Sequence, residues 1–236
     1  MAEHAIMLML NCAKKTRQVD AITRKAEWGP RRSAGVREMS SKTLGIIGVG
    51  NIGRIGAKIA GQGFGMKVLG YDPYVADDEL RRRGVESLDE LLPQVDVLTC
   101  HTPLTPETRG MINERTIGLM KPGAIFVNTS RGPVQQEHAL FESLTRGKLA
   151  AAGLDVFEQE PVGADNPLLC AVDGRGGAVE GRRNGGSVNQ AFFIGARGQV
   201  LARRKREAPR PRKMVLAVQA ASTGGRRSAR AKAMAT

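Results

Sequence analysis

The stretch TLGIIGVGNIGRIGAKIAGQG, residues 43–63, decides the fold. Residues 43–50 are a short apolar run with the length and composition of a buried strand, and residues 51–63 place apolar side chains at helical spacing. Between them, Gly48, Gly50 and Gly53 form the pattern G-x-G-x-x-G, which between a strand and a helix is typical of a dinucleotide-binding turn. The first glycine permits the tight turn, the second lets the backbone approach a pyrophosphate, and the third lets the helix pack closely on the strand.

Apolar runs and helical segments alternate onward from this stretch. The predicted strands are residues 43–50, 66–72, 95–101, 124–130 and 149–157. The predicted helices are residues 51–63, 77–84, 87–94, 107–120 and 134–147. Because continuous apolar strands alternate with helices, the sequence predicts an α/β fold: a doubly wound parallel sheet of the Rossmann type, covered by helices on both faces.

Asp72 ends the second predicted strand, 19 residues after Gly53. A carboxylate at that position can accept hydrogen bonds from both hydroxyls of an adenosine ribose and would repel a 2′-phosphate, so it favours NAD over NADP. A second interpretation is that Asp72 only opens a turn with Pro73. Arg54 would suit NADP, but we expect it on the solvated face of its helix.

Charge is distributed unevenly along the 236 residues, whose formal net charge is +13. Residues 171–236 carry 15 of the 36 Lys and Arg residues and only 3 of the 23 acidic residues, so the rest of the chain is almost neutral. The three cysteines have no metal-ligand spacing, which favours free thiols in a reducing cytoplasm and no metal site. We expect neither a signal peptide nor a membrane-spanning segment.

Residues 2–17 are predicted to form one helix that is apolar nearly all round, and such a helix packs against more than one neighbour. The expected division of the chain has three parts. Residues 1–40 hold this helix and a connector, residues 41–169 the dinucleotide-binding domain, and residues 170–236 a disordered basic tail.

Six stretches of the chain resemble the D-isomer-specific 2-hydroxyacid dehydrogenase family, in the order in which that family has them. They are AEHAIMLML (2–10), GIIGVGNIG (45–53), GFGMKVLGYDP (63–73), HTPLTPETRGMIN (101–113), GAIFVNTSRGPV (123–134) and AAGLDVFEQEP (151–161). The resemblance covers about residues 2–169 and is to the family's NAD-binding domain. The first stretch looks like the hinge helix that bridges the two domains in this family.

The resemblance implies an NAD-dependent oxidoreductase that transfers a hydride between NAD and a small 2-hydroxy or 2-keto acid, such as phosphoglycerate, hydroxypyruvate or glyoxylate. It implies that Arg131 clamps the substrate and that Glu160 pairs with a catalytic histidine. Asp155 would hold the nicotinamide carboxamide. The remaining cofactor-binding residues that it implies are Gly48, Gly50, Asn51, Ile52, Gly53, Asp72, Thr102, Pro103, Thr108, Thr129 and Ser130. Without the resemblance, Arg131 would be interpreted as a surface arginine and Glu160 as an ordinary acidic residue.

The chain departs from the family pattern in two places. The family's catalytic histidine follows the glutamate in a Thr-Pro-His context, whereas the histidines here are His4, His101 and His138. The family also has a substrate-binding segment before the hinge helix, and this sequence starts at that helix. We therefore expect weak or no turnover. The alternative is a non-catalytic NAD-binding interaction module that uses the basic tail.

The tail, residues 170–236, has three competing interpretations. It is a nucleic-acid-binding arm, a disordered extension of a working enzyme, or the product of a shifted reading frame. A nucleic-acid partner is disfavoured because Phe192 and Phe193 are the only aromatic residues there. For the rest of the chain we expect a homodimer through residues 2–17 and the NAD domain, since residues 7–10 are expected to have few partners within so short a chain.

Overall fold

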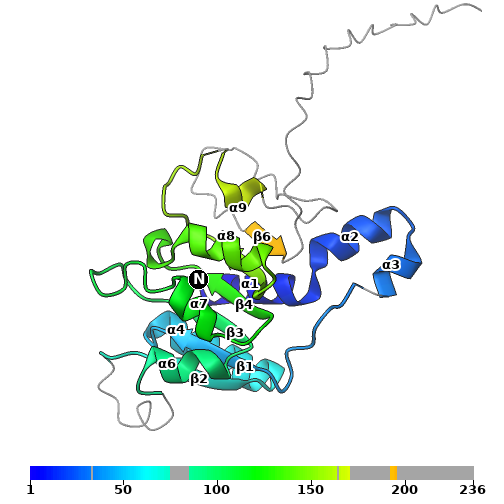
Figure 1. Ribbon diagram of the computed structural model, residues 1–236. Helices are drawn as coiled ribbons and strands as arrows, with labels where there is room; N and C mark the ends of the chain where they lie inside the picture. Colours follow the sequence, from blue (N-terminus) through cyan, green and yellow to red (C-terminus); the bar gives the residue numbers. More distant parts are fainter. Residues whose placement is uncertain (33, 75–84, 164, 171–191, 196–236) are drawn as a thin grey trace, which may run out of the picture. The chain divides into compact units, whose positions relative to one another are not determined.

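A computed structural model describes residues 1–32, 34–74, 85–163, 165–170 and 192–195 (Figure 1). Its centre is one sheet in the order β2-β1-β3-β4-β5-β6. The parallel strands are β1 (Thr43–Ile47), β2 (Lys67–Tyr71), β3 (Val97–Cys100), β4 (Ala124–Asn128) and β5 (Leu149–Leu154). The chain order reverses between β1 and β3, so the predicted doubly wound parallel sheet is confirmed.

A sixth strand, β6 (Phe192–Gly195), joins the sheet from the segment that the sequence predicts to be a disordered tail. It pairs antiparallel with β5, Leu154 lying opposite Phe192. These four residues lie within the predicted tail, so the strand is a feature that the sequence did not predict there. Apart from Cys170, the rest of the predicted tail lies outside the described residues. The three interpretations of the tail concern those residues and stay predictions.

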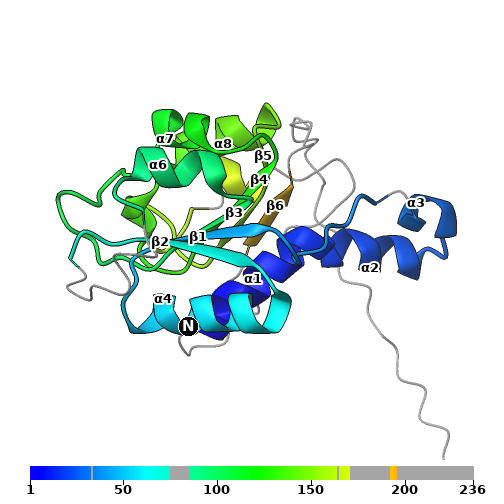
Figure 2. The same cartoon turned by 90° about the horizontal axis from the view of Figure 1, so that it is seen from below.

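The two faces of the sheet follow from the alternation of side chains along each strand. Leu44 and Ile46 pack on one side together with α1 (Ala2–Lys14), which also contacts α4 (Asn51–Lys58). Leu98 and Phe126 point to the other side, into the core under α6 (Leu88–Leu91), α7 (Glu114–Leu119) and α8 (Glu137–Thr145). Figure 2 shows the sheet between these two helical layers. Both faces are buried, which explains why the strands are continuous apolar runs.

The N-terminal helix is shorter than predicted. It ends at Lys14, and Lys15 adopts the left-handed conformation with φ 50° and ψ 43° before α2 (Thr16–Arg24) begins. The Nζ atom of Lys15 donates a hydrogen bond to the carbonyl of Ala34 at 2.7 Å, which helps to hold this break. The prediction of one helix over residues 2–17 is therefore wrong at its last turn. A short helix, α3 (Trp28–Arg32), follows α2 to one side of the sheet (Figures 1 and 2).

The expectation that residues 7–10 have few partners is also wrong for most of them. Leu8 and Met9 are fully buried against the chain's own sheet, and Leu10 is partly buried. Met7 is 41% exposed. Contacts within a single chain thus bury most of the apolar side chains at these four positions.

Most other predicted elements exist but are shorter than expected. Helix α7 begins only at Glu114, because Asn113 forms a capping box with Thr116 there. The helix predicted over residues 51–63 is confirmed as α4 followed by a π-helical turn, η1 (Ile59–Gly63). The remaining elements are two 3₁₀ turns, η2 (Leu92–Gln94) and η3 (Gly132–Val134), and α9 (Pro167–Cys170). The helix predicted over residues 77–84 lies outside the described residues.

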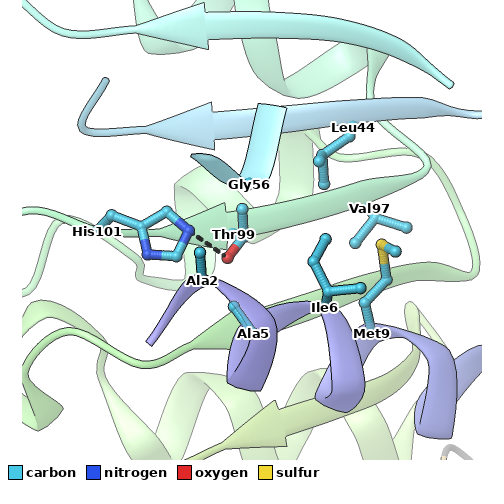
Figure 3. A pocket seen from close by; sticks show the side chains of 9 residues that line it. All are labelled: Ala2, Ala5, Ile6, Met9, Leu44, Gly56, Val97, Thr99 and His101. Atoms are coloured by element: carbon cyan, nitrogen blue, oxygen red, sulfur yellow. Dashed lines mark hydrogen bonds between the residues drawn. The ribbon is translucent and has the colours of Figure 1, made fainter. Parts of the chain in front are cut away.

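A small hollow lies between α1, α4 and the sheet (Figure 3). Its walls are Ala2, Ala5, Ile6, Met9, Leu44, Gly56, Val97, Thr99 and His101. Gly56 is buried in the middle of α4, and a Cβ atom added to it would meet no heavy atom within 4 Å. By contrast, a Cβ atom on Gly53, one turn earlier, would overlap the carbonyl oxygen of Gly48.

We predict opposite effects for the same substitution at these two glycines. Gly56→Ala removes backbone freedom from the unfolded chain and adds a methyl group to the hollow, so the free energy of unfolding should rise by about 1 kcal/mol. Gly53→Ala should lower it by about 1–3 kcal/mol because the new methyl group overlaps backbone. Urea unfolding followed by circular dichroism measures both. Equal changes in one direction would contradict the packing described for α4.

Candidate cofactor site

The carboxyl ends of the five parallel strands lie in one row. In the sheet register Ile47 pairs with Tyr71 and with Cys100, Cys100 pairs with Asn128, and Asn128 pairs with Leu154. The residue that follows each strand therefore reaches the same edge. These residues are Gly48, Asp72, His101, Thr129 and Asp155, and ligands of open α/β sheets bind at this edge.

The glycine turn after β1 has the geometry that its sequence predicts. Gly48 has φ +91°, and a Cβ atom there would lie 2.8 Å from the carbonyl carbon and oxygen of His101. Gly53 is packed against the carbonyl of Gly48, whereas Gly50 is exposed and a Cβ atom on it would meet nothing within 4 Å. The turn is thus closed toward the sheet and open at Gly50. No side chain caps the start of α4, so its first amides face this opening, as an anion requires.

Asp72 is bonded to the glycine turn. Its Oδ2 accepts a hydrogen bond from the amide of Val49 at 2.8 Å, and its Oδ1 accepts one from the amide of Tyr74 at 3.0 Å. The bond to Tyr74 agrees with the turn interpretation and the bond to Val49 places the carboxylate beside the glycine turn, while the ribose contact stays a prediction. A carboxylate has about four lone-pair directions, so acceptors are left for ribose hydroxyls. The exposed Arg54 donates from Nε to the carbonyl of Val49 at 3.1 Å.

Unpartnered polar atoms concentrate at this edge. Within the described ranges, the buried hydroxyls of Thr102 and Thr129 and the buried Oδ1 of Asp155 make no hydrogen bond. Buried polar atoms in folded proteins are almost always hydrogen-bonded, so three such atoms after neighbouring strands indicate a ligand with donors and acceptors of its own. Asn51 and Ile52, at the exposed start of α4, lie beside the opening at Gly50.

Three other predicted cofactor residues shape the backbone. The hydroxyl of Thr108 donates to the carbonyl of Pro103 at 2.7 Å and accepts from the amide of Thr105 at 2.8 Å, so it closes the loop after β3. The hydroxyl of Ser130 donates to Oδ1 of the fully buried Asn128 at 2.7 Å.

Asn128, which lies in the stretch 123–134 but to which the sequence assigned no role, organises the loop after β4. Its Nδ2 donates to the carbonyl of Arg131 at 3.1 Å and to Oε1 of Gln135 at 3.0 Å. The only sequence signal for it is a polar residue at the end of an apolar strand.

The loops after β4 and β5 are locked together. Gly132 lies so close to the backbone of Phe157 that a Cβ atom would overlap the Phe157 carbonyl. Glu137 and Glu158 exchange hydrogen bonds, each accepting with Oε1 from the other's amide, at 2.6 and 2.7 Å. The amide of Asp155 also donates to the carbonyl of Asn128 at 3.0 Å. These contacts therefore fix the positions, relative to each other, of the two loops that carry Arg131 and Glu160.

Arg131 and Glu160, the two predicted catalytic residues, are both exposed at this edge. One terminal nitrogen of Arg131, Nη1, donates to the carbonyl of Ser130 at 2.7 Å. One oxygen of Glu160, Oε1, accepts from the amide of Phe157 at 3.0 Å. In both residues this bond holds the side chain against its own loop, while the exposed part of the charged group faces solvent.

His4 reaches the same edge from the first turn of α1, a position that the sequence pattern did not predict. Its Nε2 lies 3.3 Å from Oδ1 of Asp155, within ion-pair distance but not aligned as a hydrogen bond. Burial raises the pKa of the Asp155 carboxyl, the charge of His4 opposes the rise, and the Glu160 carboxylate adds to it.

His101 has a structural role. Its Nε2 lies 3.1 Å from the hydroxyl of Thr99 (Figure 3). Burial, with a smaller contribution from the positive amino terminus of Met1, lowers its pKa from 6.5 to about 4, so the ring is neutral at pH 7. His138 is exposed on α8.

The remaining titratable side chains of the described residues give no sign of a metal site. Among the residues whose placement is described, no three His, Cys, Asp or Glu side chains gather as a metal ion would require. Cys12 and Cys100 are buried free thiols, and burial raises the pKa of Cys12 to about 12. No helix in this described part has the length and apolar character needed to cross a membrane.

The parallel sheet, the glycine turn and the acidic end of β2 define a Rossmann-type dinucleotide-binding domain. Residues 6–173 match the model of the NAD-binding domain of the D-isomer-specific 2-hydroxyacid dehydrogenases. The chain belongs to this family, whose members are NAD-dependent oxidoreductases, and the predicted resemblance and the predicted cofactor are confirmed.

Individual relatives agree with this assignment. The D-3-phosphoglycerate dehydrogenase of Methanocaldococcus jannaschii is 46% identical over 171 residues, which are 71% of this chain and 32% of that protein. The hydroxypyruvate reductase of Blautia hydrogenotrophica is 52% identical over 136 residues, 57% of this chain and 42% of that protein. The crystal structure of the Aquifex aeolicus D-lactate dehydrogenase with NAD and lactic acid superposes with a TM-score of 0.62 and 42% identity, covering 67% of this chain and 48% of that one. The chain thus spans less than half of each of these proteins.

The lowered pKa of His101 predicts an acid-sensitive fold. Between pH 6.5 and about 4 the unfolded chain binds a proton at this residue and the folded chain does not, so its contribution to stability is present above pH 6.5 and is lost as the pH falls. The loss approaches about 1.4 kcal/mol per pH unit. Between pH 7.5 and 4.5 the wild type should therefore lose about 2 kcal/mol more than His101→Gln, measured by urea unfolding. His138→Gln should follow the wild type, and identical losses in all three proteins would contradict the prediction.

Proposed function

We propose that this chain binds NAD across the carboxyl ends of β1–β5 and, in the complete protein, serves hydride transfer between NAD and a small 2-hydroxy or 2-keto acid. The observation that carries the proposal is the pair of buried hydroxyls on Thr102 and Thr129 that make no hydrogen bond, together with the buried Asp155 carboxylate at the same edge, beside the open glycine turn. When bound, NAD supplies or accepts the hydride.

Each part of the cofactor would meet a matching group. The pyrophosphate would lie at Gly50 and at the amides of Asn51 and Ile52. The adenosine ribose would bond to the free lone pairs of Asp72. Thr102 and Thr129, with Pro103, Thr108 and Ser130 holding the neighbouring backbone, would line the middle of the cleft. Asp155 would accept from the carboxamide.

The substrate would meet Arg131 and Glu160. The planar guanidinium of Arg131 suits a carboxylate next to a carbonyl or hydroxyl group, because it offers two parallel donors. A glutamate raises the pKa of a histidine paired with it, which keeps a proton available for the carbonyl oxygen. The substrates named in the relatives, phosphoglycerate, hydroxypyruvate and glyoxylate, share this 2-oxygenated acid group.

Turnover by this chain alone should be slow. Between Pro161 and Thr236 the sequence contains no histidine that Glu160 could orient. We also propose a cytoplasmic homodimer. The exposed apolar side chains of α1 and α4, Met7, Ile52 and Ile55, would lie in or near the contact between the two copies.

The ribose contact predicts a change in cofactor preference. Asp72→Asn removes a charged acceptor and the repulsion of a 2′-phosphate, so NAD affinity should fall by about 10- to 100-fold while NADP affinity holds or rises. Isothermal titration with both cofactors measures this. Asp89→Asn, which removes an exposed carboxylate paired with Arg115, is the matched control and should leave both affinities unchanged. Unaltered NAD binding in Asp72→Asn would exclude the proposed ribose site.

The missing histidine predicts a low rate. General acid–base help contributes about two to four orders of magnitude, so reduction of hydroxypyruvate or glyoxylate by the wild-type chain should stay below about 0.1 per second. Loss of NADH absorbance measures it, and Arg131→Ala should abolish whatever remains. A rate near about 10 per second would refute the need for a histidine after Glu160. NAD binding without any turnover would favour the non-catalytic interaction module.

A further inference from the structure

The contact between His4 and Asp155 joins residues 151 positions apart in the sequence. The Asp155 side chain is only 5% exposed and that of His4 is 19% exposed. Both Nε2 of His4 and Oδ1 of Asp155 are buried, and within the described part of the chain neither atom has a hydrogen-bond partner other than the opposing side chain. A nearly buried carboxylate oxygen is thus faced by an imidazole and still has a free lone pair.

The position of His4 is fixed by the packing of α1. Ala2 and Ala5, on either side of it in the first turn, are buried against the sheet and line the hollow next to His101 (Figure 3). With its neighbours held in this way, His4 is carried to the end of β5 rather than to solvent. The first turn of α1 is therefore part of the wall of the cofactor site.

Without a cationic neighbour, the ionised form of the Asp155 carboxyl would be unfavourable at this place. Glu160, from the loop after β5, repels it, and the amino terminus of Met1 and His4 attract it. Burial also disfavours the ionised form. If Asp155 Oδ1 is to accept a hydrogen bond from a neutral amide while it is buried near Glu160, a second group must stabilise its negative charge. That group has to be a cation or a hydrogen-bond donor held in a fixed position.

We propose that His4 is a positioning residue for Asp155 and holds its carboxylate in the orientation that receives the carboxamide of NAD. This inference rests on the proposed function, in which Asp155 faces the nicotinamide. His4 itself would touch neither the adenosine nor the pyrophosphate. Its effect should therefore be confined to the nicotinamide half of the cofactor.

ADP-ribose provides the discriminating probe, because it has the adenosine, the pyrophosphate and both riboses of NAD but no carboxamide. Titration calorimetry of the full chain should show that His4→Gln weakens NAD binding by about three- to thirtyfold, the range of coupling between contacting residues. Affinity for ADP-ribose should stay within about twofold of the wild type. His138→Gln, which changes an exposed histidine on α8, should alter neither affinity.

A double-mutant cycle tests the route through Asp155. In the Asp155→Asn background, His4→Gln should produce no further loss of NAD affinity, because the carboxylate that it positions is gone. All variants keep the same amino terminus, since that charge also acts on Asp155. A further loss of NAD affinity in the double variant, beyond that of Asp155→Asn, would show that His4 does not act through Asp155.

Four other results would overturn the inference. NAD affinity that does not change in His4→Gln would show that the contact has no role in binding. Equal losses for NAD and ADP-ribose would show that His4 only supports the fold of α1. If the wild-type chain binds ADP-ribose as tightly as NAD, Asp155 does not hold the carboxamide, although the cleft itself is confirmed. Binding of neither ligand by the wild type would instead refute the proposed function and this inference with it.

Discussion

The approach of backbone to backbone at the first turn sets the rest of the structure. Gly48 lies against the carbonyl of His101, and Gly53 lies against the carbonyl of Gly48, so the turn after β1 contacts both α4 and the end of β3 through backbone atoms. A Cβ atom on Gly48 would overlap the backbone of His101 after β3, and one on Gly53 would push α4 away from Gly48. With the turn closed in this way, the start of α4 and the row of strand ends face one common opening. This arrangement supports the proposal that the helix amides, the Asp72 carboxylate and the hydroxyls after β3 and β4 bind one elongated ligand.

A second contact of the same kind governs the other end of the site. Gly132 brings the loop after β4 onto Phe157, and Asn128 binds both sides of that loop from within the core. Several predicted site residues, Thr108 and Ser130 among them, have hydroxyls occupied by these internal bonds. The site is thus a rigid frame of backbone with a small number of free polar atoms, as preorganised binding requires.

The sequence predicted what depends on local pattern. The glycine turn, the five apolar strands and the acidic end of β2 were all expected, because each needs only a short run of residues. The break at Lys15 was not expected, since neither glycine nor proline marks it and the bond from Lys15 to Ala34 fixes it from a distance. Asn128 and His4 were missed for the same reason: their partners are recognisable only once β4, β5 and α1 have been brought together. Strand β6 has no apolar rhythm around it, and its pairing with β5 is again a property of the folded chain.

The exchange of bonds between Glu137 and Glu158 also restricts how the chain could diversify. Gln136 gives α8 no side-chain cap, so the first amide of that helix is satisfied by Glu158 from a different loop. Asn166 adds a bond from farther along, donating to the other oxygen of Glu137 at 2.6 Å. An inserted or deleted residue between Asp155 and Glu158 would leave the helix start unsatisfied while also displacing Glu160. The number of residues between Asp155 and Glu158 is therefore constrained more tightly than their identity. Insertions and deletions should be tolerated better in the other loops of the domain.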